Sequence, residues 1–207
     1  GLLLGFWVAF GAVADLVDRS RLGRIPLRES WRRLVGLPRS AWSTALAHFG
    51  IGVTVLGIVS TSAWETEIVT TLSPGESTEL SGYIIAFDRF GQVAGPNYVA
   101  DEGHFTITAP NGTIRQPVAE RRTYVASGMP TTEAAIETFG FSQLYLQLGE
   151  RLDTNHVIRV WHKPYITLIW LGAILMSIAG ALSLTDRRMR IGVPMRRVHP
   201  VGPDAAE

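Results

Sequence analysis

Three apolar runs alternate with polar segments along this chain of 207 residues. The longest, residues 40–64, holds 25 residues without Asp, Glu, Lys or Arg, enough to cross a bilayer core of about 30 Å as a helix. A second uncharged run covers residues 165–185, and a third, residues 1–14, is short for a span. The pattern predicts an α plus β membrane protein with three transmembrane helices, at residues 1–17, 41–64 and 165–185. Since Gly1 lies inside an apolar run, we expect the first helix to begin upstream and the chain to be the C-terminal piece of a longer polypeptide.

The polar stretch between the second and third helices, residues 65–164, has the composition of β structure. We expect seven strands, at residues 67–72, 79–90, 104–109, 113–118, 121–126, 143–148 and 156–162. Asn111 and Gly112 predict a two-residue hairpin turn with positive φ at both positions. Residues 91–96 are expected to form a loop, and residues 131–137 one or two helical turns. Strands at this spacing predict an extracytoplasmic antiparallel β domain, a small barrel or sandwich.

Basic residues are concentrated in the segment before the second helix. Residues 19–39 carry seven Arg and one Glu, and short basic loops of this kind face the cytoplasm. The orientation predicts a cytoplasmic loop at 18–40, a periplasmic domain at 65–164 and a cytoplasmic tail at 186–207. We expect residues 192–207 of this tail to be disordered. Because topology accounts for the basic cluster, we expect no nucleic-acid partner, and its interleaved apolar residues favour an amphipathic helix at the lipid headgroups.

Small residues recur at every fourth position in the first and third apolar runs. Such stripes let helices pack closely in lipid, although a generic apolar helix explains the first run equally well. The two stripes are Gly1, Gly5 and Ala9, and Ala173, Ser177 and Ala181.

His48 is the titratable residue of the longest apolar run. A neutral imidazole is a common metal ligand, and a haem iron needs only one such nitrogen from each flanking helix. The alternative is a histidine that hydrogen-bonds a neighbouring helix and serves packing alone. The chain has no cysteine, which excludes a disulfide framework, a Cys-ligated metal and a thiol redox role.

The other candidate histidines have simpler interpretations. His104 alternates with apolar residues on its strand and is expected on the solvated face. His162, with Arg159, precedes the third helix and is expected to contact lipid phosphate or a bound anion. His199 lies in the tail and has no evident partner.

Four sequence motifs follow one another along the chain. They are AHFG at 47–50, GPNY at 95–98, MPTTEAAI at 129–136 with LYLQLG at 144–149, and KP at 163–164 leading to SLTDRR at 183–188. In order and spacing they resemble the haem-lyase membrane subunit of bacterial cytochrome c maturation, the CcmF and NrfE type. The resemblance covers nearly the whole chain, as the C-terminal third of the family.

The resemblance implies a multi-pass protein of the bacterial inner membrane that helps attach haem covalently to apocytochrome c on the periplasmic side. In that family two histidines on different helices hold a transmembrane haem b, and His48 matches one of them. The second ligand would lie outside this chain. Implied partners are apocytochrome c, a haem chaperone, thiol-handling proteins of the pathway and the lipid bilayer.

The same resemblance limits what this chain is expected to do alone. The haem-handling loop of the family lies outside these residues, so we assign no catalytic residue and expect no lyase activity from this chain by itself. The competing hypothesis is a non-catalytic, membrane-anchored β-domain scaffold in which His48 only packs.

Overall fold

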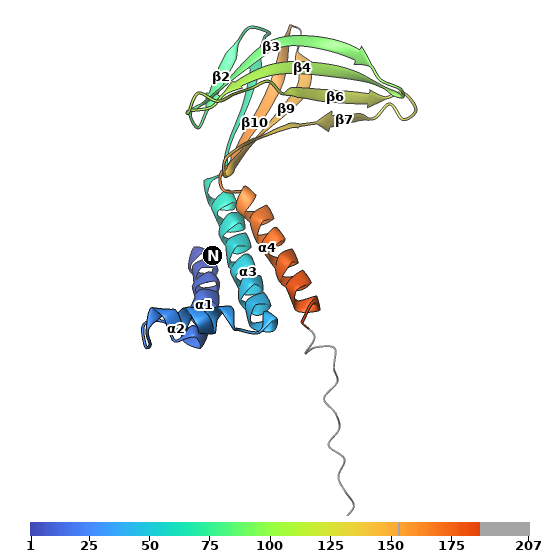
Figure 1. Ribbon diagram of the computed structural model, residues 1–207. Coiled ribbons are helices and arrows are strands. Elements are labelled where there is room, and N and C mark those ends of the chain that lie inside the picture. The colour runs from blue at the N-terminus through green and yellow to red at the C-terminus, as the bar shows by residue number, and fades with distance from the viewer. Residues whose placement is uncertain (153, 187–207) are drawn as a thin grey trace, which may run out of the picture.

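The computed structural model describes residues 1–152 and 154–186 and consists of a helical part and a β domain (Figure 1). Its helices are α1 (Leu2–Ser20), α2 (Leu27–Val35), α3 (Arg39–Trp64) and α4 (Thr167–Leu184). The β domain is inserted between α3 and α4 and lies at the far end of this helix pair from α2 (Figure 1). The predicted tail, including His199, falls outside the described residues except for Asp186.

Helices α3 and α4 pack with their backbones in close contact. A side chain at Gly50 would put its Cβ 2.9 Å from the carbonyl oxygen of Gly172, and one at Gly172 would collide with Thr54. Gly57 is equally crowded by the backbone of Ile169. Glycine is therefore required at these crossing points, since any Cβ would push the helices apart. The buried residues of α4 are Gly172 and Ala179, so the predicted stripe at Ala173, Ser177 and Ala181 is not the packing face.

The opposite side of α3 packs against α1 through small residues. Gly5 and Ala9 of α1 are buried, and a Cβ at Gly52 of α3 would lie 2.8 Å from the Cβ of Ala9. A side chain at Gly1 would meet Val59 in the same way. The predicted stripe on α1 is thus its contact face with α3.

Polar contacts join α3 to the segments flanking α4 at both of its ends. At the start of α3, the backbone N–H of Ser40 donates to the carboxylate of Asp186 at 3.0 Å, which also places a negative charge where the helix dipole favours one. At its end, the hydroxyl of Thr61 donates to the carbonyl of Pro164 at 2.9 Å. The register between the two helices is therefore fixed from end to end.

Two of the three predicted spans have the required length and composition. Among the described residues, α3 and α4 are long and apolar enough to cross a membrane, with mean hydropathies of 1.6 and 2.0. Helix α1 carries Asp15, Asp18 and Arg19 in its last turns and does not meet that description. A membrane-spanning role for α1 stays a prediction.

The β domain consists of two antiparallel sheets, and the predicted barrel or sandwich is a sandwich. One sheet has the order β1 (Thr66–Leu72), β10 (Asn155–Lys163), β9 (Ser142–Leu152) and β8 (Ala135–Phe139). The other has the order β2 (Ser77–Leu80), β3 (Tyr83–Ala94), β4 (Tyr98–Thr108), β6 (Val118–Tyr124) and β7 (Pro130–Glu133), with β5 (Ile114–Arg115) also on β4. Alternate residues of both sheets fill the core between them, chiefly Ile85, Phe87, Phe105, Ile107, Leu144, Leu146, Leu148, Ile158 and Val160.

The hairpin turns differ from the prediction in an instructive way. Gly112 has φ +81° as expected, but Asn111 does not have positive φ. The reason is that Pro110, Asn111 and Gly112 form a three-residue loop, in which the N–H of Gly112 donates to the carbonyl of Ala109. Positive φ at both central residues occurs instead at Ser81 and Gly82. That turn divides the predicted strand 79–90 into β2 and β3.

Two predicted interruptions of the sheet are wrong. Residues 91–96 were expected to form a loop, but β3 continues to Ala94 and pairs with β4. The expected helical turn at 131–137 is two strands, β7 on β6 and β8 on β9, so the chain passes there from one sheet to the other. Free edges of β6 and β9 were available for pairing, and this tertiary pairing overrides the local helix preference.

The glycine contact between α3 and α4 leads to a testable difference between two glycines of α4. Gly172→Ala should destabilise the protein by about 1–3 kcal/mol, because the added methyl group overpacks the contact with Thr54 and Gly50. Gly180→Ala is the matched control, since no atom of residues 1–152 and 154–186 lies within 4 Å of a Cβ there. Thermal unfolding in nanodiscs measures both. Equal melting temperatures for the two variants would contradict this packing.

Candidate functional site

His48 lies on the exposed surface of α3 beside the seam with α1. Its Nδ1 lies 2.8 Å from the carbonyl oxygen of Thr44, one turn earlier in the same helix. A carbonyl can only accept, so Nδ1 carries the proton and Nε2 is left with a free lone pair. Nε2 has no hydrogen-bond partner among the described residues. A fixed tautomer with the second nitrogen free is the usual arrangement of a histidine that ligates a metal.

His48 lines a groove of about 390 Å³ between α1 and α3. Small residues form part of its wall, and no atom of the described residues lies within 4 Å of a Cβ placed at Gly11. Most of the lining is apolar, and Asp15 and Arg19 provide the charged groups. The complete lining is Trp7, Val8, Gly11, Ala12, Asp15 and Arg19 of α1, with Thr44, Ala45 and His48 of α3.

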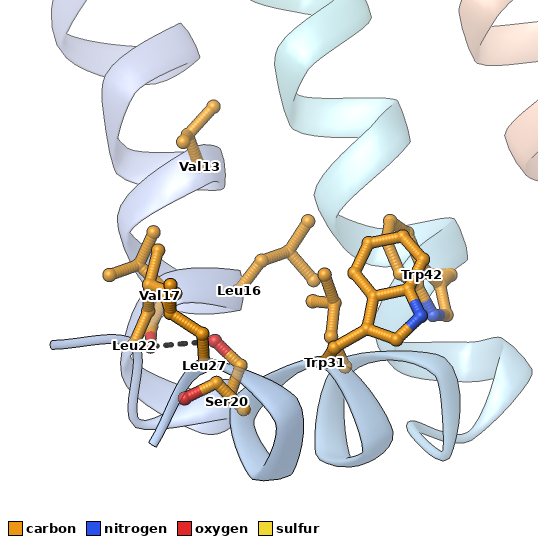
Figure 2. Close-up of a pocket in the computed structure, with 10 residues that line it drawn as sticks. Val13, Leu16, Val17, Ser20, Leu22, Leu27, Trp31 and Trp42 are labelled. Atoms are coloured by element: carbon orange, nitrogen blue, oxygen red, sulfur yellow. Dashed lines mark hydrogen bonds between the residues drawn. The ribbon is translucent and has the colours of Figure 1, made fainter. Parts of the chain in front are cut away.

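A larger cavity of about 420 Å³ lies where α1, α2 and the start of α3 meet (Figure 2). Its polar side chains are serines already engaged with the backbone: the hydroxyl of Ser20 donates to the carbonyl of Val17 at 3.0 Å, and that of Ser30 to Arg21 at 3.4 Å. This cavity offers no side chain that would ligate a metal. The groove at His48 is therefore the better candidate site.

The number of donor groups indicates which kind of metal the groove suits. Within the part of the chain that the structure describes, no three His, Cys, Asp or Glu side chains gather into a group that could hold a bare metal ion. A haem supplies four nitrogens of its own and needs only axial ligands from the protein. One histidine over a small-residue wall fits one face of a haem.

The surface histidines of the β domain have partners within the protein. His104 lies on the outer face of β4, with Nε2 3.3 Å from the carboxylate of Glu102 and Nδ1 3.3 Å from the guanidinium of Arg89. His162 is half-buried against Tyr83, with ring centroids 5.4 Å apart, and burial lowers its pKa. The expected contact of His162 with lipid phosphate or a bound anion stays a prediction.

Arg159, expected to act with His162, is engaged elsewhere. It forms an ion pair with Glu67, which lowers the pKa of that carboxyl, and its guanidinium lies 4.6 Å from the ring centroid of Trp161. These contacts within the sheet account for the position of Arg159.

His156, a titratable residue that the sequence patterns left without a role, lies in the core of the β domain. It is 3% exposed, and its ring lies 4.3 Å from that of Phe90 and 5.4 Å from that of Phe87. Neither ring nitrogen has a hydrogen-bond partner within the described part of the chain. Burial lowers its pKa, the positive charge of Arg151 lowers it further, and Asp101 opposes this. His156 is therefore neutral in the folded domain at neutral pH.

The sequence did contain a signal for His156. On a strand, residues two apart share a face, and His156 has the parity of Ile158 and Val160, both fully buried. An alternation count over β10 would have placed its side chain in the core.

Comparison with known proteins then identifies the family. A family model described as the CcmF C-terminal β-sandwich matches residues 63–164. The cytochrome c-type biogenesis protein CycK of Rhizobium meliloti is 48% identical over 197 residues, which are 95% of this chain. The chain belongs to the CcmF family. The curated relative from Pseudomonas aeruginosa, cytochrome c-type biogenesis protein CcmF, is 35% identical over 94% of the chain.

Known structures agree with the fold of this CcmF-family chain. A solved structure titled cytochrome c haem lyase CcmF matches with a TM-score of 0.65 over 85% of this chain and 34% of that one, at 14% identity. That likeness shows the fold alone. The chain spans 29% of the length of the CycK and Pseudomonas relatives, so the activity of a whole CcmF protein is not assigned to it by similarity.

The buried histidine of the CcmF-family sandwich predicts a pH-dependent stability. His156 has a lower pKa folded than unfolded, so below its ordinary value of about 6.5 the unfolded chain binds more protons. Stability is then complete above about pH 6.5 and falls as the pH drops. The melting temperature of the β-sheet circular dichroism signal should be lower at about pH 5 than at pH 7.5.

His156→Leu should weaken this dependence, with His162 contributing what remains, because its pKa is lowered by the same cause. His104→Gln controls for the loss of a histidine as such, since it changes the outer face and leaves the core intact. An undiminished pH dependence in His156→Leu would contradict the assignment.

Proposed function

We propose that this chain provides one axial ligand, His48, for a transmembrane haem b, and a periplasmic docking domain for covalent haem attachment to apocytochrome c. The observation that carries the proposal is the free Nε2 of His48 in a groove with a small-residue wall. Membership of the CcmF family supports a place in cytochrome c maturation. The second ligand would come from a helix outside this chain.

The residues of the groove would hold the haem in defined ways. The carbonyl of Thr44 fixes the His48 ring through Nδ1, so Nε2 would bind the iron without a further loss of side-chain freedom. Gly11 leaves room for a flat macrocycle to approach the backbone of α1. The apolar lining excludes water. Bound haem b supplies one-electron transfer, with a potential set by its axial ligands and by the polarity around it.

The β domain would serve as the docking part. It is attached rigidly, because β1 begins two residues after Trp64 and Thr61 holds the link to α4 through Pro164. Docking partners would be apocytochrome c, a haem chaperone and thiol-handling proteins, on the periplasmic side of the bacterial inner membrane. No catalytic residue is assigned to this chain, and haem transport and attachment would require the whole protein.

The alternative is a scaffold in which His48 only packs. That function would require a hydrogen bond from His48 to a neighbouring helix. The partner of Nδ1 is a carbonyl of its own helix, and Nε2 has no partner among the described residues. This geometry favours the ligand role.

A ligand role for His48 predicts a spectroscopic loss. His48→Ala in the complete protein should abolish or greatly reduce the haem b absorption, because one axial bond is removed. His48→Gly supplied with free imidazole should partly restore it. His104→Ala is the control and should leave the spectrum intact. A normal six-coordinate haem spectrum in His48→Ala would return His48 to a packing role.

The proposed orientation is tested separately by reporter fusions. A periplasm-only reporter should be inactive at Arg28 and active at Asn111, because the arginine-rich segment before α3 is expected to stay in the cytoplasm. A cytoplasmic reporter should give the opposite pattern. Activity of the periplasmic reporter at Arg28 and silence at Asn111 would invert the topology.

A further inference from the structure

We propose that Arg19 binds a propionate of the haem held by His48, and so determines which edge of the tetrapyrrole faces the α2 end of the helices. The proposal rests on the haem function proposed above. It assigns a cofactor-positioning role to a residue that the family resemblance and the sequence patterns leave without one.

The groove at His48 has one charged end and one apolar end. Among its lining residues, Asp15 and Arg19 carry the charges, and both belong to the part of α1 next to α2. Trp7 and Val8 line the other end. A haem is amphipathic in the same sense, with two propionate carboxylates on one edge and apolar groups on the others. Propionates at the apolar end would be buried carboxylates without a cation, which is costly.

The contacts of Arg19 leave room for a second carboxylate. Its Nε donates to Oδ2 of Asp15 at 2.8 Å, one turn earlier on α1. The guanidinium has five N–H donors, and its two terminal nitrogens have no partner among the described residues. Asp15 therefore holds the guanidinium at Nε and fixes the direction of its two terminal nitrogens. These two nitrogens can bind both oxygens of a carboxylate in the usual paired geometry.

The spacing along the helices agrees with the dimensions of a haem. Helices α1 and α3 are antiparallel, and the contact of Ala9 with Gly52 puts His48 level with Val13. Arg19 is six residues farther along, or about 9 Å at roughly 1.5 Å per residue. A propionate reaches beyond the rim of the macrocycle and the arginine side chain is long, so the two groups can meet while the iron is at His48.

The nearby arginine outside the groove provides a matched comparison. Arg24 forms an ion pair with Asp18 at 3.1 Å and is absent from the groove lining. Both arginines lie at the same end of α1 and both are paired with an aspartate. Only Arg19 lies where a haem edge would arrive.

The first test measures the midpoint potential and the content of haem b in the complete protein. Arg19→Gln should lower the potential, because a cation near the macrocycle stabilises the reduced, less positive haem. Arg19→Lys should lower the potential less than Arg19→Gln does, since lysine keeps the positive charge but loses the paired N–H donors of the guanidinium. Arg24→Gln should leave the potential unchanged. An unaltered potential and haem content in Arg19→Gln would overturn the proposal.

The second test needs no variant that might fold poorly. The apoprotein is reconstituted with haem or with haem dimethyl ester, in which both propionates are esterified. The unmodified protein should bind the ester about tenfold or more weakly, as expected for the loss of a charge-assisted hydrogen bond. Arg19→Gln should bind haem and haem dimethyl ester with nearly equal affinity, because the substitution and the esterification remove the same interaction. Equal affinities in the unmodified protein would overturn the role of Arg19.

The two proposals fail in different ways. If His48→Ala loses the haem spectrum while Arg19→Gln and the ester change nothing, the haem function stands and the role of Arg19 is wrong. If His48→Ala keeps its six-coordinate haem, the haem function itself is wrong.

Discussion

The close backbone contact of α3 with both of its neighbours is the constraint on which the rest of this structure depends. Gly50 and Gly57 press against α4, and Gly52 presses against Ala9 of α1. With contacts on both sides, α3 cannot rotate about its own axis without a collision. The face that carries His48 is therefore directed at the α1 groove. The same contacts hold α4 beside α3, which fixes both attachment points of the β domain.

The chemical character of the site comes from the groups around one nitrogen, Nε2 of His48. A lone histidine is a poor site for a bare metal ion, which needs several ligands, but it suffices for one face of a haem. The carbonyl of Thr44 sets the tautomer, small residues give access, and Arg19 with Asp15 gives the groove a charged end. Each of these features is ordinary alone. Together they would define the orientation of the proposed haem, which is flat and amphipathic.

The sequence predicted those features that depend on composition and on long periodic patterns. Helices α3 and α4, the position of His48 within α3 and the long strands β4, β9 and β10 follow from apolar runs and alternation. The β7–β8 crossover was missed because its strands exist by pairing with edges that are far away in the sequence. A helix preference at 131–137 could not compete with those hydrogen bonds.

Residue-level geometry was less predictable. The packing face of α4 passes through Gly172, because backbone approach decides it, and not through the stripe of small residues beside it. The turn with two positive φ values uses Ser81 and Gly82. The turn predicted at Asn111 instead has Pro110 as its first central residue, and proline does not adopt positive φ. The free Nε2 of His48 depends on a side-chain rotamer that spacing does not reveal.

The central claim is that His48 binds iron through Nε2 inside the α1–α3 groove. A cryo-electron microscopy map of the complete protein in nanodiscs tests it most directly. The account predicts tetrapyrrole density against Gly11 and Ala45, an iron bonded to Nε2 of His48, and Nδ1 still hydrogen-bonded to Thr44. A groove filled by a protein helix or a lipid chain, with the tetrapyrrole elsewhere, would contradict it.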